Sequence, residues 1–434
     1  MSFEKYLPSQ FERFVDSLAN EVISGDKQKI TLLIGKNGTG KSFVLSEILK
    51  RSVQDGVTTL ATSFGLSDRF PFSREGAYVY IGARSSANAI HINSIDSKIF
   101  DAIVAKWSDD CFRQRLKQIC ELLELPVDFK ARIVLRQKNE GIELTDFLMD
   151  SWVRRTGAGR AAWPLLTATN FYSDEQRKRF AAELGRKFKL SVSDVESGFA
   201  ILQSIALFDK AIDGKNRQWL RGVVPIAAIA EIGEVEKIIP ALRFMGIVGE
   251  FSLSIGGEGG SAWLSSGQKS ILFTLVQISR YITTNALILI DEPEISLHPE
   301  WQSKYLSFLQ QIFGDVPCKI VLATHSPFFV VSTAAETALV YSLRRTDKGH
   351  EWQCIETLSG LTVDVAAVDG FGVRYPSSPH LEQLLFTAIE ELGKPAPNLK
   401  TIATLYKRLA PLVRDPSDPL RVVVDKLEQF KMVL

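Results

Sequence analysis

The sequence predicts an α/β fold with a mostly parallel sheet, a helical insert and a mainly helical C-terminal region. Apolar segments at 30–34, 286–290 and 319–323 each precede a loop and a helical stretch, which is typical of strands in a parallel sheet. The region from 98 to 222 carries mostly helical patterns instead. With 434 residues, the chain is long enough for two or three domains.

The expected elements follow in chain order. ITLLI (30–34) reads as a buried strand, a loop follows, and SFVLSEILKRSV (42–53) reads as a helix. The later segments are TTLATSF (58–64) and AYVYIGA (77–83) as strands, FRQRLKQICELLEL (112–125) as a helix of the insert, FSLSI (251–255), ALILI (286–290) and KIVLA (319–323) as strands, and PEWQSKYLSFLQQIF (299–313) as a helix. TALVYSLRR (337–345) and EWQCIETL (351–358) flank a turn and predict a hairpin, and HLEQLLFTAIEEL (380–392) and LKTIATLYKRLAPLV (399–413) predict helices.

These elements suggest four segments. They are an N-terminal part of the core (1–97), a helical insert or arm (98–222), a C-terminal part of the core (223–345), and a hairpin with a helical region (346–434).

Composition excludes some function classes. Lysine plus arginine (51) nearly equals aspartate plus glutamate (50), so nucleic-acid binding would need a local basic patch. The four cysteines form no CxxC pair, which argues against zinc and against a disulfide framework. The N-terminus is polar and no apolar run is long enough to span a bilayer, so we expect a cytoplasmic protein without membrane contact of its own.

A phosphate-binding loop follows the first strand. The segment matches GxxxxGK[ST] in full, with a strand before it and a helix after it. Glycine lets backbone N–H groups approach phosphates, Lys41 can reach the β- and γ-phosphates, and Ser42 can supply a hydroxyl to magnesium. The residues expected to bind the nucleotide here are Gly35, Lys36, Asn37, Gly38, Thr39, Gly40, Lys41 and Ser42.

Two carboxylates end the strand at 286–290. Asp291 suits magnesium, and Glu292 can orient and deprotonate an attacking water. In isolation such a pair could equally be a solvated strand end. Because a phosphate loop precedes it in the chain, the sequence favours a catalytic pair.

Leu264-Ser265-Ser266-Gly267-Gln268 stands before the helical run KSILFTLVQISRYI, and Thr324-His325-Ser326-Pro327 follows the strand KIVLA. A serine hydroxyl and a glycine N–H at a helix start can bind an anion, although LSSGQ alone could be an ordinary helix cap. LSSGQ resembles the ABC signature LSGGQ, and His325 resembles the ABC switch histidine. The four motifs together, with LSSGQ about twenty residues before the Asp291-Glu292 strand, resemble an ABC-type P-loop NTPase.

The resemblance implies particular roles. It implies that Ser265, Ser266, Gly267 and Gln268 close on the γ-phosphate of ATP held by the opposite subunit, so that a homodimer sandwiches two ATP molecules with Mg²⁺. It also implies that Lys41, Glu292 and His325 act in hydrolysis. Glu294-Ile295-Ser296-Leu297-His298-Pro299 occupies the place of the D-loop, and SLHP with THSP looks like the RecF, SMC and OLD branch. The resemblance covers residues 25–95 and 250–335.

One family element is missing. The family usually has a glutamine at a strand end before the helical region, but no glutamine occurs from 55 to 113. Asn88 or Asn93 could replace it, or both could be solvated loop residues.

The insert carries basic clusters. They are Arg154-Arg155, Arg177-Lys178-Arg179 and Arg186-Lys187 with Lys189, and they are interleaved with Phe171, Tyr172, Phe180 and Phe188. They could bind nucleic-acid phosphates, or they could form a solvated helix face above core aromatics.

Three functions compete: a soluble ATPase of the RecF/SMC/OLD branch, the ATPase subunit of a transporter, and a monomeric P-loop kinase or switch. The signature disfavours the last, and LHP, THSP and the long insert disfavour the transporter. The insert is too short for an SMC coiled coil, and the 109 residues after His325 show no paired acidic motif of a nuclease. The chain thus resembles ATPase subunits of bacterial antiphage defence systems, which act through a separate effector such as a nuclease. DNA repair or recombination is the alternative.

Overall fold

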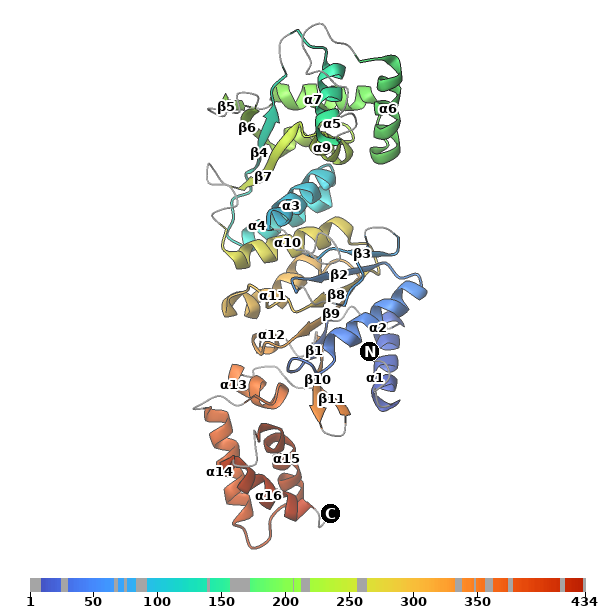
Figure 1. Ribbon diagram of the computed structural model, residues 1–434. Coiled ribbons are helices and arrows are strands. Elements are labelled where there is room, and N and C mark those ends of the chain that lie inside the picture. The colour runs from blue at the N-terminus through green and yellow to red at the C-terminus, as the bar shows by residue number, and fades with distance from the viewer. Residues whose placement is uncertain are drawn as a thin grey trace. The chain divides into compact units, whose positions relative to one another are not determined.

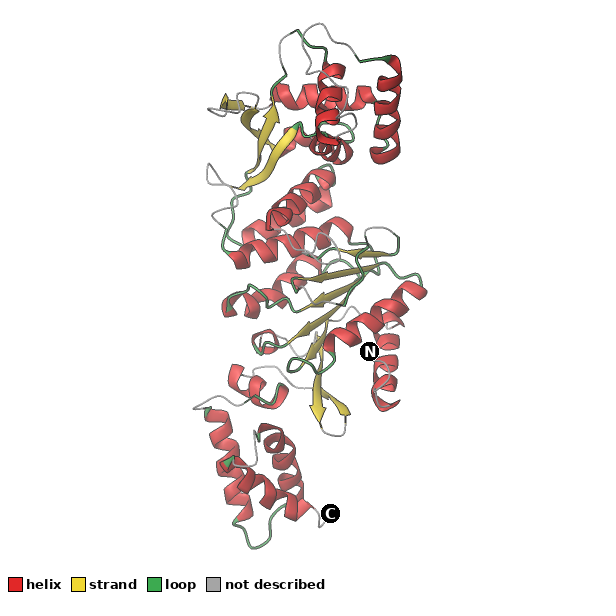
Figure 2. Cartoon of the chain, viewed as in Figure 1, coloured by secondary structure: helices red, strands yellow, loops and turns green. Residues whose placement is uncertain are grey.

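The computed structural model describes residues 9–24, 30–65, 69–73, 76–82, 92–138, 141–156, 172–205, 207–211, 219–255, 264–331, 338–346, 349–355, 362–373, 378–413 and 418–431. The chain divides into two compact units, Met1–Ala89 with Ile282–Leu434 and Ile90–Tyr281. Figure 1 labels their elements, and Figure 2 separates helices from strands. The four predicted segments have other boundaries than this division, and they stay predictions.

The first unit contains a seven-stranded sheet in the order β11-β10-β1-β9-β8-β2-β3. Its strands are β1 (Ile30–Ile34), β2 (Thr59–Ser63), β3 (Tyr78–Tyr80), β8 (Leu287–Asp291), β9 (Lys319–Thr324), β10 (Ala338–Thr346) and β11 (Gly349–Ile355). All neighbouring pairs are parallel except β10 with β11. The predicted mostly parallel sheet and the predicted hairpin are therefore confirmed.

Helices cover both faces of this sheet. The connection from β1 through α2 (Lys41–Gln54) to β2 moves toward the β3 edge of the sheet. The connection from β8 through α11 (Pro299–Phe313) to β9 moves toward the β11 edge. Because such crossovers are right-handed, α2 and α11 lie on opposite faces (Figure 1). Every residue of β1 and β8 is buried, as expected for strands covered on two sides.

An N-terminal helix that the sequence analysis did not predict, α1 (Ser9–Ser24), packs beside α2. Its buried Phe11, Phe14 and Leu18 join the core cluster of the sheet, and Phe14 stacks on Trp352 of β11 with ring centroids 4.7 Å apart. The helix therefore covers the hairpin end of the sheet.

The C-terminal helices have a hydrophobic cluster of their own. The elements described after β11 are α13 (Val363–Val365), the π-helical η4 (Ala366–Gly370), α14 (Pro379–Leu392), α15 (Leu399–Leu409), η5 (Ala410–Leu412) and α16 (Pro419–Lys431). Leu384, Leu405 and Leu427 are buried where α14, α15 and α16 meet. The predicted helices in this region are confirmed.

The second unit combines helices with a four-stranded antiparallel sheet in the order β5-β6-β4-β7. The strands are β4 (Phe129–Arg136), β5 (Leu207–Ala211), β6 (Trp219–Pro225) and β7 (Val248–Ile255). The helices are α3 (Ile92–Lys106), α4 (Asp110–Leu122), α5 (Leu144–Thr156), α6 (Asp174–Phe188), α7 (Val192–Ile205), α8 (Ile226–Ala230), α9 (Val235–Phe244) and α10 (Ser266–Tyr281).

The insert is thus less helical than its sequence predicts. Residues 98–222 contribute β4, β5 and the start of β6, and FSLSI lies in β7, which pairs with β4. In β4 the buried Phe129, Ala131, Ile133 and Leu135 alternate with residues on the other face. Because charged residues occupy most of that other face, the strand lacks the continuous apolar run of the parallel core strands.

Candidate nucleotide-binding site

The phosphate loop connects the end of β1 to the start of α2. A Cβ atom at Gly35 would lie 2.3 Å from the backbone oxygen of Leu343 in β10, so no larger residue fits without a shift of the backbone. Gly38 and Gly40 have φ of 80° and 97°, in the region that glycine tolerates best. The three glycines of the motif therefore allow a loop that approaches its neighbouring strand closely.

The start of α2 has no side-chain cap. Gly40 is the N-cap residue, and Thr39 donates its hydroxyl hydrogen bond to the backbone oxygen of Lys36 at 2.9 Å. The N–H groups of the first turn therefore point into the loop without a capping oxygen, which is the arrangement that favours a bound anion. Ser42, at the second helical position, is half-buried.

Lys41 lies inside the loop and is only 5% exposed. Its Nζ donates to the backbone oxygens of Gly35 at 2.8 Å and Lys36 at 3.0 Å. Burial lowers the pKa of Lys41, while the charges of Glu294, Glu292 and Asp291 act to raise it. These three carboxylates are thus close enough to interact with the Lys41 ammonium, so positive and negative charges lie side by side at the loop.

The two predicted carboxylates stand at the end of β8, between β2 and β9. Asp291 is the last residue of the strand, pairs in register with Ser63 and Ala323, and is buried. Glu292 has a left-handed φ of 50°, and its N–H donates to the backbone oxygen of Ala323 at 2.9 Å. The chain therefore turns sharply at the carboxyl edge of the sheet, where the half-buried Glu292 follows directly after Asp291.

His325 follows β9 at the same edge and is held by Glu294. Its backbone N–H and its Nδ1 both lie within hydrogen-bond distance of Oε1 of Glu294, at 2.6 and 2.8 Å. The hydrogen bond to Glu294 raises the pKa of His325, burial opposes this, and the charge of Glu292 adds to the increase. Because Nδ1 is engaged, Nε2 is the ring nitrogen left to meet a ligand.

Glu294 is a residue of the candidate site that the sequence did not reveal. It appears there only as the first residue of the D-loop-like segment, yet it is 7% exposed and holds His325 through two contacts. The signal available in the sequence was a third acidic residue two positions after the Asp291-Glu292 pair. Its partner stands 31 residues away, so only the fold joins the two.

A further contact links the segments around Glu294 and His325. Ser326 donates its hydroxyl hydrogen bond to Oε1 of Gln302 in α11, and Nε2 of Gln302 donates to the backbone oxygen of Leu297 at 2.8 Å. His298 caps α11, and Pro299 is the first residue of that helix. Helix capping therefore explains part of the SLHP pattern.

The signature-like residues lie in the other unit. Ser265 accepts from the N–H of Gln268 at 3.1 Å, and Oε1 of Gln268 accepts from the N–H of Ser265 at 3.0 Å, so the two form a capping box for α10. Nε2 of Gln268 also donates to the backbone oxygen of Leu123 at 3.1 Å. Ser265 and Ser266 are exposed, whereas Gly267 is buried. Gln268 therefore supports the helix start, and the two serines remain accessible.

The structure assigns no residue to the place of the family's glutamine, for which Asn88 and Asn93 were the candidates. Asn88 lies outside the described residues. Asn93 belongs to α3, but its side chain is also outside the described part of the structure.

The loop fits the phosphates of a nucleotide. Gly35 leaves no room for a Cβ, the start of α2 is uncapped, and Lys41 is buried beside three carboxylates. The Ser42 hydroxyl and the Asp291 carboxylate are oxygen donors of the kind that Mg²⁺ takes, together with phosphate oxygens. Within the described residues no group of three or more His, Cys, Asp and Glu side chains could hold a metal, and no described helix is long and apolar enough to cross a membrane.

A protein-family model described as "AAA domain, putative AbiEii toxin, Type IV TA system" matches residues 30–332, which is more than half of the chain. The match runs from the first residue of β1 to the segment after α12 (Phe328–Val331), so it includes the phosphate loop, the second unit, Asp291 and His325.

Curated relatives share parts of the sequence. The chain is 27% identical over 217 residues to the Septu protein PtuA of Bacillus thuringiensis, which covers 45% of this chain and 53% of PtuA. It is 32% identical over 75 residues to the retron Ec83 probable ATPase of Escherichia coli, covering 15% of this chain and 14% of that protein. Protein ea59 of Escherichia phage lambda is 26% identical over 109 residues, 25% of this chain and 18% of ea59. The chain thus spans about half of PtuA and less than a fifth of the other two.

Proposed function

The chain belongs to this AAA-domain family of P-loop ATPases, and on that premise we propose that it binds ATP between two copies of itself and hydrolyses it to ADP and phosphate to control a separate effector protein. The sequence motifs resemble those of ATPases in antiphage defence systems, and the relatives PtuA and the retron ATPase agree with this resemblance. We therefore extend a role in antiphage defence to this chain.

The observation that carries the proposal is the charge arrangement at the carboxyl edge of the seven-stranded sheet. Lys41 follows the loop after β1, Asp291 and Glu292 stand at the end of β8, and His325 follows β9. The charges of Asp291 and Glu292 act to raise the pKa of Lys41, and the charge of Glu292 acts to raise the pKa of His325. Such convergence at strand ends is where open α/β sheets bind ligands. A site that offers one buried cation, an uncapped helix start and several carboxylates suits a metal–triphosphate.

Each residue has a role that follows from its position. Lys41 and the N–H groups of the loop offset phosphate charge, and Ser42 with Asp291 would hold Mg²⁺, which when bound neutralises further phosphate charge. Glu292 accepts a proton from the attacking water. Glu294 holds His325 with Nε2 directed away from the carboxylate, so the imidazole can donate to the γ-phosphate and respond to its loss.

The second half of each site would come from the other copy. Ser265 and Ser266 are exposed at the start of α10, where their hydroxyls and the helix N–H groups can receive an anion. Gln268 is already used within its own unit, through Ser265 and the Leu123 oxygen. We therefore expect the two serines and Gly267, rather than Gln268, to meet the partner's γ-phosphate.

Light scattering with ATP and magnesium tests the dimer. Glu292→Gln should accumulate as a dimer because it binds ATP but lacks the base, and adding Ser265→Arg should return it to a monomer. Ser204→Arg in the Glu292→Gln background is the matched control, since Ser204 is another exposed serine of the same unit. A Glu292→Gln protein that stays monomeric at saturating ATP would contradict the proposal.

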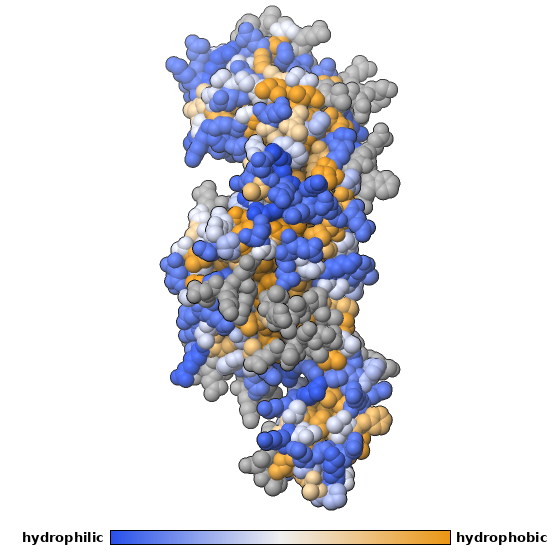
Figure 3. All heavy atoms as spheres, turned by 180° about the vertical axis from the view of Figure 1, so that it is seen from behind, coloured by the Kyte–Doolittle hydropathy of each residue, from blue (hydrophilic) through white to orange (hydrophobic). Residues whose placement is uncertain are grey.

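The C-terminal helices support the effector part of the proposal. Phe386 and Ile389 of α14 are 73% and 59% exposed, and Val422 of α16 is 62% exposed. Figure 3 shows orange residues among blue ones on the surface of these helices. Phe386 and Ile389 are three residues apart and therefore lie on one side of α14, and neighbouring exposed apolar side chains of this kind are typical of protein-interaction surfaces.

Affinity purification from phage-challenged cells tests the effector. We expect one major partner with Glu292→Gln, and loss of that partner in Phe386→Asp but not in Val53→Asp, a control at an apolar residue exposed on α2. The isolated chain should not cut DNA with magnesium or manganese. DNA cleavage that persists in Lys41→Ala would show an intrinsic nuclease, and ATPase stimulation by DNA ends without any partner would favour the repair alternative.

A further inference from the structure

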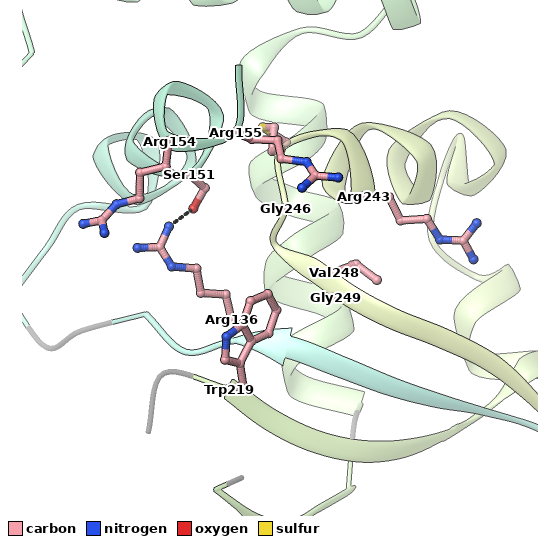
Figure 4. A pocket seen from close by; sticks show the side chains of 10 residues that line it. Arg136, Ser151, Arg154, Arg155, Trp219, Arg243, Gly246, Val248 and Gly249 are labelled. Atoms are coloured by element: carbon pink, nitrogen blue, oxygen red, sulfur yellow. Dashed lines mark hydrogen bonds between the residues drawn. The ribbon is translucent and has the colours of Figure 1, made fainter. Parts of the chain in front are cut away.

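A pocket of about 520 Å³ lies in the second unit (Figure 4). Its lining is rich in arginine and contains one tryptophan and no carboxylate. The lining residues are Arg136, Ser151, Arg154, Arg155, Trp219, Arg243, Met245, Gly246, Val248 and Gly249. Neither the phosphate loop nor the signature-like segment contributes to it.

Three parts of the unit meet at this pocket. Arg136 ends β4 and stands directly opposite Trp219 of β6, so both side chains lie on the same face of the sheet. Ser151, Arg154 and Arg155 have the spacing that puts residues on one side of α5, near its C-terminal end. Arg243 comes from the last turn of α9. Figure 4 shows these side chains around the end of β4.

Glycine makes room for the tryptophan. The pairing of β7 with β4 shifts register between Val134 and Leu135, and Gly249 is the residue skipped on β7. A Cβ atom at Gly249 would lie 2.7 Å from the Trp219 ring. The indole therefore reaches across β4 to lie against the Gly249 backbone, and it remains half-buried.

The pocket carries excess positive charge. Asp150 is shared by Arg136 at 2.9 Å and Arg154 at 2.8 Å, and Arg136 also donates to Ser151 at 2.6 Å. Arg243 lies 3.6 Å from Asp101. Arg155 is exposed and forms no ion pair with any described residue. In the ion pairs that the structure describes at this pocket, Asp150 pairs with Arg136 and Arg154, and Asp101 pairs with Arg243. Arg136 is fixed in place by Asp150 and Ser151.

The positive charge continues from the pocket along the sheet. Lys130, Arg132 and Arg136 alternate on the outer face of β4, and the register adds Arg221 of β6 beside Val134. Residues two apart in a strand are about 7 Å apart, so the cations form a row. Along this row Asp128 binds Lys130 at 2.9 Å, and the register places Glu250 opposite Val134.

We propose that this face binds single-stranded nucleic acid, with one base stacked on Trp219 and the neighbouring phosphates on Arg155, Arg221 and Arg132. A row of cations beside one accessible aromatic ring is the arrangement used for single strands, because phosphates need a line of charge and a base needs a flat apolar surface. A free nucleotide would use the pocket but not the row. A duplex hides its bases from the indole.

Fluorescence anisotropy of the full chain tests the proposal. The probes are labelled twelve-nucleotide thymidine and uridine strands, with a duplex of equal length, in buffer without ATP. Trp219→Leu should weaken strand binding about tenfold or more. Arg155→Glu with Arg221→Glu should weaken it and should lower the slope of log affinity against log salt by about one unit or more.

The controls separate this site from general charge and from the ATP site. Arg186→Glu removes an exposed arginine of α6 that does not line the pocket, and Trp301→Leu removes a half-buried tryptophan of the first unit. Both should bind the strand as the wild type does. Lys41→Ala should also bind normally, so failure of the ATPase proposal would leave this one intact. Thermal melting of each variant checks its folding.

Several results would overturn the proposal. Unchanged binding in folded Trp219→Leu and in the double arginine variant would do so. An equal loss of strand binding in Arg186→Glu would mean that the loss in the double arginine variant reflects the net charge of the chain and not this site. Thymidine monophosphate competing as well as the twelve-nucleotide strand would identify a mononucleotide pocket, and preference for the duplex would exclude base stacking.

Discussion

The carboxyl edge of the seven-stranded sheet and the outer face of the four-stranded sheet are built on different principles. At the first, the ends of parallel strands bring Lys41, Asp291 and His325 to one point, where the lysine is buried and carboxylates compensate its charge. At the second, antiparallel strands place Arg132, Arg136 and Trp219 on one face of the sheet. The first arrangement suits a compact, highly charged group, and the second suits an extended ligand.

The largest expected effect falls on the compact site alone. Lys41→Ala should reduce ATP hydrolysis about a hundredfold to a thousandfold, because it removes a buried cation placed at the phosphates. A phosphate-release assay measures this. Lys50→Ala on the same helix should keep normal activity, since Lys50 is exposed and pairs with Glu47 on the surface of the helix. Normal ATP turnover in purified Lys41→Ala would contradict the assignment of ATP hydrolysis to the carboxyl edge of the seven-stranded sheet.

Gly35→Ala should lower ATP affinity by roughly a hundredfold, equal to about 2.8 kcal/mol. The added Cβ would lie 2.3 Å from the Leu343 oxygen, so the loop must move away from β10. Titration calorimetry with a slowly hydrolysed ATP analogue measures the loss. Strand binding by the second unit should not change, and a parallel loss of both activities would mean that the variant misfolds as a whole.

Gly198→Ala should act on the second unit instead. Its Cβ would lie 2.7 Å from Cδ1 and Cγ2 of Ile238 where α7 packs on α9, and such overpacking costs about 1–3 kcal/mol of unfolding free energy. Gly185→Ala in α6 is the matched control, because nothing lies within 4 Å of its Cβ and alanine favours a helix. Denaturant melts should show a loss in the first variant and none in the second. Equal melts would contradict the packing argument.

The smallest expected effect concerns pH. Glu294 raises the pKa of His325 in the folded chain, so the pair's contribution to stability is fully present below the unfolded pKa of about 6.5 and is lost as pH rises through the folded value. Glu294→Gln should lower the pKa of His325 and flatten this loss of stability above pH 6.5. Histidine ring NMR and melting temperatures from pH 5.5 to 8.5 measure both. Glu300→Gln, which removes the partner of Lys304, should leave the His325 titration unchanged.

The sequence by itself determined most of the first unit and its motifs. The strands β1, β8 and β9 are covered on both faces, so each reads as a continuous apolar run, and a loop with a recognisable phosphate, carboxylate or histidine motif follows each one. The glycines at 35, 38 and 40 and the serine before α10 are likewise local requirements of turns and caps. Such requirements are visible because the residues that satisfy them are adjacent in the chain.

Only the tertiary structure decided the remaining features. The contact of Glu294 with His325, the position of Trp219 opposite Arg136, and the indole against Gly249 all join residues distant in sequence. β4 escaped prediction because charged residues occupy three of the four positions on one of its faces, so its longest apolar run has only three residues. The register between β4, β6 and β7 places those charges beside one tryptophan, and register depends on pairings that no single segment encodes.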